Sequence, residues 1–174
     1  MLVKANIVYK DDRWKKIPLQ KIAQSSLNLI VDKILHKEKQ LEISILASND
    51  FELAKLNKQY RGSSTPTNIL AWPEHDFKRS TPGALPNYTS TSYGDFDGFD
   101  FIGNLAISFD RCSIESEETN IIFDNHLTHL LVHGCLHLIG FDHHDELDAR
   151  LMEDVERKLL SELGIKNPYE TIGR

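Results

Sequence analysis

The chain has 174 residues, of which 40% are hydrophobic and 26% charged, values typical of a globular domain with a sizeable core. No run approaches the roughly 18 apolar residues of a membrane span, and the charged N-terminus is unlike a signal peptide, so we expect a cytoplasmic protein with no membrane partner. The two cysteines exclude a disulfide framework and a four-cysteine zinc site.

The net charge of −6 is unevenly distributed along the chain. Residues 1–61 carry 12 Lys or Arg and 7 Asp or Glu, a balance of +5, whereas the remainder carries −11. The N-terminal part could therefore present a positive face to a polyanion even though the whole protein is acidic. The alternative is that these charges only solvate exposed faces.

Strands and helices mix along the chain. In chain order we expect a strand at 2–10, an amphipathic helix from Pro18 to Leu35, a strand at 41–48, a helix at 51–61, strands at 68–73 and 101–110, and helices at about 123–139 and 146–164.

Residues 74–99 have no sustained periodicity and are rich in Ser, Thr, Gly, Pro and Asp. They predict a long loop that is either a lid or partly disordered. The chain has no internal repeat and no interdomain linker. We therefore predict an α+β fold in which residues 1–174 form one metallohydrolase-like domain, with a small mixed sheet packed with helices.

The stretch HGCLHLIGFDH, residues 133–143, has the spacing of a metal site. His133 and His137 are four residues apart on a predicted helix, so their imidazoles lie on one face, one turn apart. Gly140 tolerates the left-handed conformation that ends a helix, and such a turn could return His143 to the same ion. The sequence therefore predicts a metal-binding helix that ends in a glycine turn.

Three neutral imidazoles suit zinc, and also nickel, copper or iron. A site with three protein ligands leaves a coordination position open, where zinc lowers the pKa of water to about 7. Structural zinc more often has four ligands that include cysteines. We therefore expect one Zn²⁺ per chain with a hydrolytic role, and we expect Cys135 in the core.

Position 134 distinguishes this site from zinc proteases. The spacing matches the pattern H-E-x-x-H-x-x-G-x-x-H at every His and Gly, but Gly134 stands where those proteases have their general base. Peptide hydrolysis by that mechanism would lack its proton acceptor. A zinc peptidase is therefore the less favoured alternative.

Three motifs resemble those of a known family. HLLVHGCLHLIGFDH (129–143) is similar to the signature of the YbeY family of metal-dependent endoribonucleases, which act in bacterial ribosomal RNA maturation. LNKQYRGSSTPTNILAWP (56–73) and FIGNLAIS (101–108) resemble further motifs of the family, with Asn68 and Asn104 where the family usually has Asp. The resemblance extends from the first strand to about Tyr169.

The resemblance implies a zinc-dependent endoribonuclease specific for single strands, acting in ribosomal RNA processing and small-subunit maturation. Its partners would be single-stranded or ribosomal RNA and the ribosome or small-subunit assembly proteins. A non-catalytic, metal-containing ribosome assembly factor is the alternative.

The resemblance also implies site residues. His133, His137 and His143 would hold the metal, and Arg61 would be catalytic, because a guanidinium can donate two parallel hydrogen bonds to phosphate oxygens. Hydroxide formed at the metal, or a 2′-hydroxyl of the RNA, would attack phosphorus. His129 is expected either to hydrogen-bond near the metal or to be a partly buried helix residue.

Overall fold

The computed structural model describes residues 3–35, 40–77, 81–88 and 98–170. Its main elements, in chain order, are β1 (Val3–Tyr9), α1 (Leu19–Ile30), β2 (Gln40–Ser48), α2 (Asp50–Arg61), β3 (Ile69–Pro73), β4 (Phe99–Ser108), α3 (Phe109–Thr119), α4 (Phe123–Leu138) and α5 (Glu146–Glu162). A short 3-10 helix at Asp12–Lys16 follows β1, and a π-helical turn at Val31–Leu35 follows α1.

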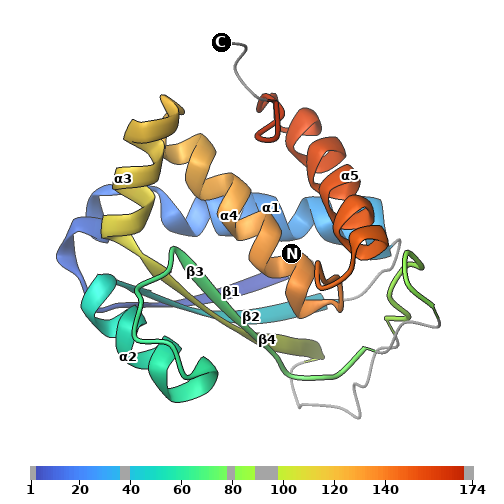
Figure 1. Ribbon diagram of the computed structural model, residues 1–174, viewed down its shortest axis with the longest axis horizontal. Helices are drawn as coiled ribbons and strands as arrows, with labels where there is room; N and C mark the ends of the chain where they lie inside the picture. Colours follow the sequence, from blue (N-terminus) through green and yellow to red (C-terminus); the bar gives the residue numbers. More distant parts are fainter. Residues whose placement is uncertain (1–2, 36–39, 78–80, 89–97, 171–174) are drawn as a thin grey trace.

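The four strands form one mixed sheet in the order β1-β2-β4-β3 (Figure 1). Strands β1, β2 and β4 are parallel, and β3 runs antiparallel to β4 at the edge. Parallel neighbours need crossover connections, which α1 supplies between β1 and β2. The predicted α+β fold with a small mixed sheet is confirmed.

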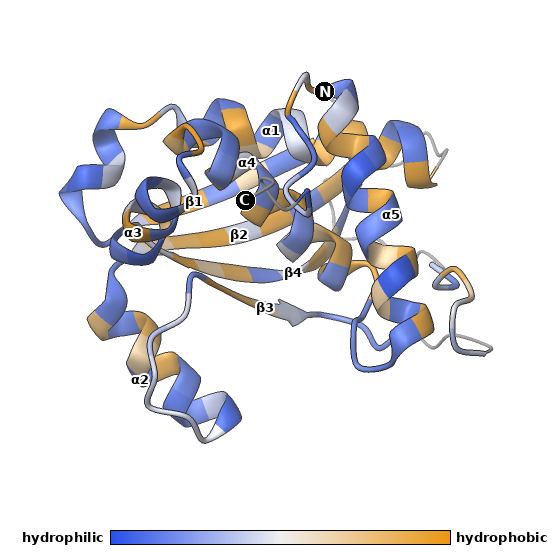
Figure 2. Ribbon diagram, turned by 45° about the horizontal axis from the view of Figure 1, so that its top comes forward, coloured by the Kyte–Doolittle hydropathy of each residue, from blue (hydrophilic) through white to orange (hydrophobic). Residues whose placement is uncertain are grey.

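The main core lies between the sheet and the layer that contains α1 and α4 (Figure 1). Alternate residues of β2 point into it, and Leu41, Ile43 and Ile45 are buried there. Burial of each such side chain stabilises the fold by about 1.5–3 kcal/mol. Figure 2 shows β2 as a largely hydrophobic strand between more polar outer helices.

Helix α2 lies on the opposite face of the sheet (Figure 1). Its Leu53 packs in a smaller core with Leu70 of β3 and Ala106 of β4. The side chain of Asn49 caps this helix by accepting a hydrogen bond from the Glu52 amide at 3.2 Å. The described part of the chain contains no helix that is both long enough and apolar enough to cross a bilayer.

Two predicted elements differ from the structure. The strand expected to end at residue 110 ends at Ser108, whose side chain accepts a hydrogen bond from the Arg111 amide and so starts the unpredicted helix α3. The helix expected to reach Leu35 is regular only to Ile30 and then widens into the π-helical turn.

In the predicted loop, the described residues 74–77, 81–88 and 98 belong to no helix or strand, whereas Phe99 begins β4. Phe77 and Tyr88 are nevertheless buried, with ring centroids 4.8 Å apart, and the Gly83 amide donates to Asp148 of α5 at 2.8 Å. The prediction of a lid or of partial disorder depends on residues 78–80 and 89–97, which lie outside the described residues.

Candidate metal centre

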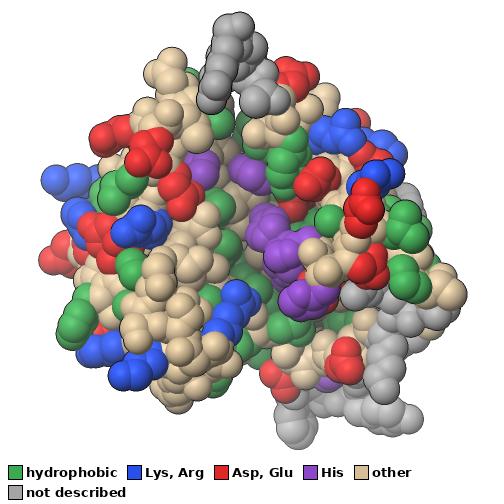
Figure 3. All heavy atoms as spheres, in the orientation of Figure 1, with side chains coloured by type: hydrophobic (Ala, Val, Ile, Leu, Met, Phe, Trp, Pro, Cys, Tyr) green, Lys and Arg blue, Asp and Glu red, His purple; other side chains and the backbone are tan. Residues whose placement is uncertain are grey.

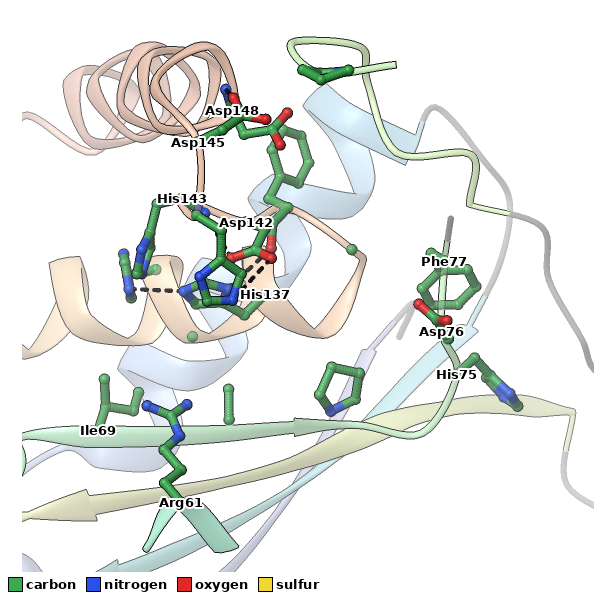
Figure 4. Close-up of a pocket in the computed structure, with 18 of the residues that line it drawn as sticks. Arg61, Ile69, His75, Asp76, Phe77, His137, Asp142, His143, Asp145 and Asp148 are labelled. Atoms are coloured by element: carbon green, nitrogen blue, oxygen red, sulfur yellow. Dashed lines mark hydrogen bonds and ion pairs between the residues drawn. The ribbon is translucent and has the colours of Figure 1, made fainter. Parts of the chain in front are cut away.

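Helix α4 and the turn after it bring the three predicted histidines together (Figure 4). The rings of His133 and His137 have centroids 4.6 Å apart. Gly140 then has a φ of +98°, and a Cβ added there would lie 2.7 Å from Cβ of Phe77, so only glycine fits this turn. The turn places the His143 ring 4.9 Å from that of His137, centroid to centroid.

The hydrogen bonds of two of these rings leave one nitrogen of each free to bind a cation. Nδ1–H of His137 donates to the Phe141 carbonyl at 3.0 Å, and Nδ1–H of His133 donates to Oε1 of Glu156 at 2.6 Å. A carbonyl and an ionised carboxylate only accept, so in the neutral rings both Nε2 atoms carry lone pairs.

These two Nε2 atoms lie 3.1 Å apart, and one nitrogen from each of the three rings lies within 4.8 Å of the others. Lone pairs that face each other at this distance repel unless a cation lies near both. The donor set therefore fits a transition-metal ion, and His133, His137 and His143 are the residues that could hold it.

His137 is in the protonation state that a metal ligand needs. Burial lowers its pKa to about 4, and the neighbouring His133 and His143 add to the effect because a second positive charge beside them is unfavourable. At neutral pH the ring is therefore uncharged, which is the form that coordinates a metal.

Glu156 of α5 lies behind His133 and is 0% exposed. Its Oε2 accepts from Nε2–H of His129 at 3.0 Å and from the hydroxyl of Tyr169. Burial alone would raise the pKa of this carboxyl, but the hydrogen bonds from His129, His133 and Tyr169 outweigh it and hold the pKa at about 2. His129 thus hydrogen-bonds beside the cluster, one of the two roles expected for it.

Arg61 lies in the same cavity as the histidines, which has a volume of about 1190 Å³. It ends α2, and Gly62, with φ of +74°, stops the helix immediately after it. Figure 4 shows the Arg61 side chain rising past β3 towards the histidines of α4. The structure therefore brings together all four residues that the sequence predicted for the site.

The walls of the cavity differ in charge. Figure 3 shows histidines lining a hollow on this face. Arg61 is the only Lys or Arg among the described residues that line it. The acidic wall consists of Asp76, Asp142, Asp145 and Asp148.

Two of the N-terminal lysines pair with acidic neighbours. Lys4 pairs with Glu42 at 3.0 Å, and Lys55 pairs with Glu52 at 3.1 Å. Neither lysine lines the cavity. Among the described residues of 1–61, Arg61 is the only Lys or Arg that lines the cavity.

Gly134 lets α4 approach the sheet closely. A Cβ added at this position would lie 2.7 Å from Cδ1 of Ile69 and 2.9 Å from Cδ2 of Leu105. Position 134 therefore faces β3 and β4, and the space between helix and sheet holds no longer side chain. The tight packing explains why glycine, and not the glutamate of the zinc proteases, stands at position 134. This further weakens the peptidase alternative.

A second carboxylate–histidine pair lies on α4 away from the three clustered histidines. Oε2 of Glu115, in α3, accepts from Nε2–H of His126 at 2.9 Å and from the amide of Asn68 at 2.9 Å. This network joins α3, α4 and the chain just before β3. It gives Asn68 a structural role that the sequence did not reveal.

Comparisons with known proteins agree with this architecture. A family model described as endoribonuclease YbeY matches residues 6–164. A relative of that name from Paracoccus denitrificans (strain Pd 1222) is 38% identical over 164 residues, which is 94% of this chain and 88% of the relative. Another, from Francisella tularensis subsp. holarctica (strain OSU18), is 37% identical over 166 residues, covering 94% and 92%.

A solved structure supports the fold. The solution structure of TM1509 from Thermotoga maritima has a TM-score of 0.52 and 20% sequence identity, over 98% of this chain and 99% of that one. At this identity the likeness concerns the fold alone.

Proposed function

Because the chain belongs to the YbeY family of endoribonucleases, we propose that it is a metal-dependent endoribonuclease that cleaves single-stranded RNA. We propose further that its substrate is ribosomal RNA, that it acts in the cytoplasm during maturation of the small ribosomal subunit, and that it meets the ribosome or small-subunit assembly proteins there.

One observation supports the chemistry most directly. The paired Nε2 atoms of His133 and His137 and the guanidinium of Arg61 lie in a single cavity. A metal site alone suits many hydrolases. A metal site beside a guanidinium suits an anionic substrate such as a phosphodiester.

In this proposal the histidines and Arg61 have different roles. His133, His137 and His143 would hold the ion, which we propose is Zn²⁺, since three imidazoles suit it. When bound, the ion supplies a Lewis acid for phosphodiester hydrolysis. Arg61 would bind two oxygens of the scissile phosphate and stabilise the negative charge that grows on them. Gly134 keeps α4 close to β3, so that Arg61 and the histidines lie in one cavity.

The test is cleavage of single-stranded ribosomal RNA by the purified, zinc-loaded protein and by His133→Ala prepared identically. We expect cleavage by the wild type and none by the variant. His126→Gln is the matched control, because His126 lies on the same helix but outside the cavity, and it should cleave at nearly the wild-type rate.

Equal cleavage by wild type and His133→Ala would contradict the proposed site and would indicate a contaminating nuclease. Absence of cleavage by a zinc-loaded wild type that still binds ribosomal particles would favour the non-catalytic assembly factor instead.

A further inference from the structure

Glu156 is an unusual residue for its place in the fold. It lies in the middle of α5, and its neighbours on the buried face of that helix are apolar: Met152, Val155, Leu159 and Leu160. Burying a carboxylate is costly unless hydrogen bonds and charge partners compensate. A leucine at this position would pack equally well. The carboxylate, which is 0% exposed, therefore needs an explanation other than packing.

The hydrogen bonds of Glu156 lead to the candidate metal centre. Oε1 accepts from Nδ1–H of His133 at 2.6 Å, and Oε2 accepts from Nε2–H of His129 and from the hydroxyl of Tyr169. A neutral imidazole can carry its proton on either nitrogen, and only the Nδ1–H form leaves Nε2 free for a metal. The carboxylate accepts and does not donate, so it selects that form.

Tyr169 reaches this carboxylate from outside the part of the chain that the family model matches, which ends at residue 164. Its ring meets the His129 ring edge-on, with centroids 5.7 Å apart, and the residue remains 40% exposed. An aromatic residue this exposed is not held by core packing. Its hydroxyl, donated to Oε2, instead fixes the second oxygen of Glu156.

We propose that Glu156 and Tyr169 are positioning residues of the metal centre: Glu156 holds His133 in its metal-binding tautomer, and Tyr169 holds Glu156. This inference rests on the proposed metal site but not on the proposed reaction. It extends the centre to the segment after α5, for which the sequence indicated no role at the metal.

The test measures Zn²⁺ affinity by competition with a chromogenic chelator, without RNA, in the full-length chain. Glu156→Gln keeps the size of the side chain and removes its charge. We expect its Zn²⁺ affinity to fall 10–100-fold, the usual effect of losing a partner behind a metal-binding histidine. Tyr169→Phe removes one hydroxyl two steps from the metal, so we expect a smaller fall, about three- to tenfold.

The chain offers a matched control for each variant. Glu115→Gln alters an equivalent carboxylate–histidine pair on the same helix, and Tyr88→Phe removes a hydroxyl that donates to Asp100 at 2.6 Å. Neither Glu115 nor Tyr88 lines the cavity that contains the clustered histidines. We expect both controls to change the Zn²⁺ affinity less than twofold, even where they lower the thermal midpoint as much as the test variants do.

A second readout follows the tautomer itself. In the metal-free wild type, the nitrogen chemical shifts of His133 should report Nδ1–H, and Glu156→Gln should move its proton partly to Nε2. A structural role for Glu156 would change the thermal midpoint without changing this equilibrium.

The outcomes separate the two proposals. Unchanged affinity in Glu156→Gln, or equal losses in Glu156→Gln and Glu115→Gln, would overturn the positioning role and leave the nuclease proposal intact. If the wild type binds Zn²⁺ and the two variants lose affinity as expected, but the wild type cleaves no RNA, the nuclease proposal is overturned and the positioning role remains.

Discussion

Arg61 is the residue that we propose binds the scissile phosphate. Its side chain is exposed and lines the cavity, and it is not one of the three candidate metal ligands. We expect Arg61→Ala to lower kcat/KM for RNA cleavage 10²- to 10³-fold while leaving the Zn²⁺ content unchanged, since loss of one stabilising donor commonly costs that much.

Arg61→Lys should recover only part of that loss, because an ammonium cannot make the paired hydrogen bonds of a guanidinium. The control is Lys58→Ala, which removes an exposed cation from the same helix outside the cavity. Steady-state cleavage of a fluorescent RNA measures all three. An Arg61→Ala variant as active as Lys58→Ala would exclude Arg61 from phosphate binding.

Asp11 should make the free energy of unfolding vary with pH in the acid range. Its carboxylate accepts from Nε of Arg13 at 3.0 Å and from Nη2 at 2.7 Å, and these hydrogen bonds lower its pKa to about 2. A carboxyl whose pKa is lower in the folded state stabilises the fold above its unfolded pKa of about 3.9, and this contribution disappears as pH falls towards 2.

We therefore expect Asp11→Asn, which retains a side chain able to cap the 3-10 helix, to be less stable than wild type at pH 6. The difference should shrink as pH is lowered from 4 towards 2.5. Urea midpoints of both proteins across that range measure it, and a difference independent of pH would contradict the lowered pKa.

Among single residues, the sequence revealed the three histidines and Arg61 but not Glu156, Tyr169 or Glu115. The histidines lie within eleven residues, and helical geometry alone brings two of them together. Glu156 is 23 residues from His133, so its contact depends on how α5 packs on α4. The helical spacing of Met152, Leu159 and Leu160 does place Glu156 on the apolar face of α5, but it does not indicate which side chain the carboxylate contacts.

Among whole elements, the close approach of α4 to the sheet is the most restrictive contact. We expect Gly134→Glu to lower the free energy of unfolding by about 3 kcal/mol or more, since overpacking costs about 1–3 kcal/mol and a buried charge adds to it. It should gain no peptidase activity. Denaturant unfolding beside Gln59→Glu, at an exposed helix site, provides the comparison, and equal stability would contradict the packing reason for Gly134.

The periodicity of the sequence predicted the long elements and missed two short ones, the 3-10 helix Asp12–Lys16 and α3. Helix α3 starts directly after β4 without an intervening loop, and only two of its residues, Cys112 and Ser116, are buried. Its apolar stripe is therefore too weak to compete with the preceding strand pattern. The π-helical turn after α1 leaves no mark on the hydrophobic spacing, so the sequence could not reveal it.

For the molecule as a whole, metal removal should loosen the site without unfolding the protein. The three histidines contribute nothing to the main core, which joins the sheet to α1, α4 and α5. Bound metal at a thousandfold excess over its Kd adds about 4 kcal/mol of stability. For a chain of this size that corresponds to a Tm about 8–16 °C higher.

We therefore expect chelation to lower the Tm by that amount and to leave the far-ultraviolet circular dichroism at 25 °C unchanged. Re-addition of Zn²⁺ should restore the Tm, and His133→Ala should show no response to either treatment. Loss of helical signal at 25 °C on chelation would mean that the ion has the folding role seen in zinc fingers.

The strand order has a consequence for the newborn chain. β4 lies between β2 and β3, so neither can complete its pairing until the ribosome has synthesised residues 99–108. Pairings between segments far apart in the sequence form more slowly than local contacts, and α4 packs on β3 and β4 of this sheet. A chain that stops before α4 and α5 would lack the three histidines and Glu156, so the proposed centre requires synthesis of most of the sequence.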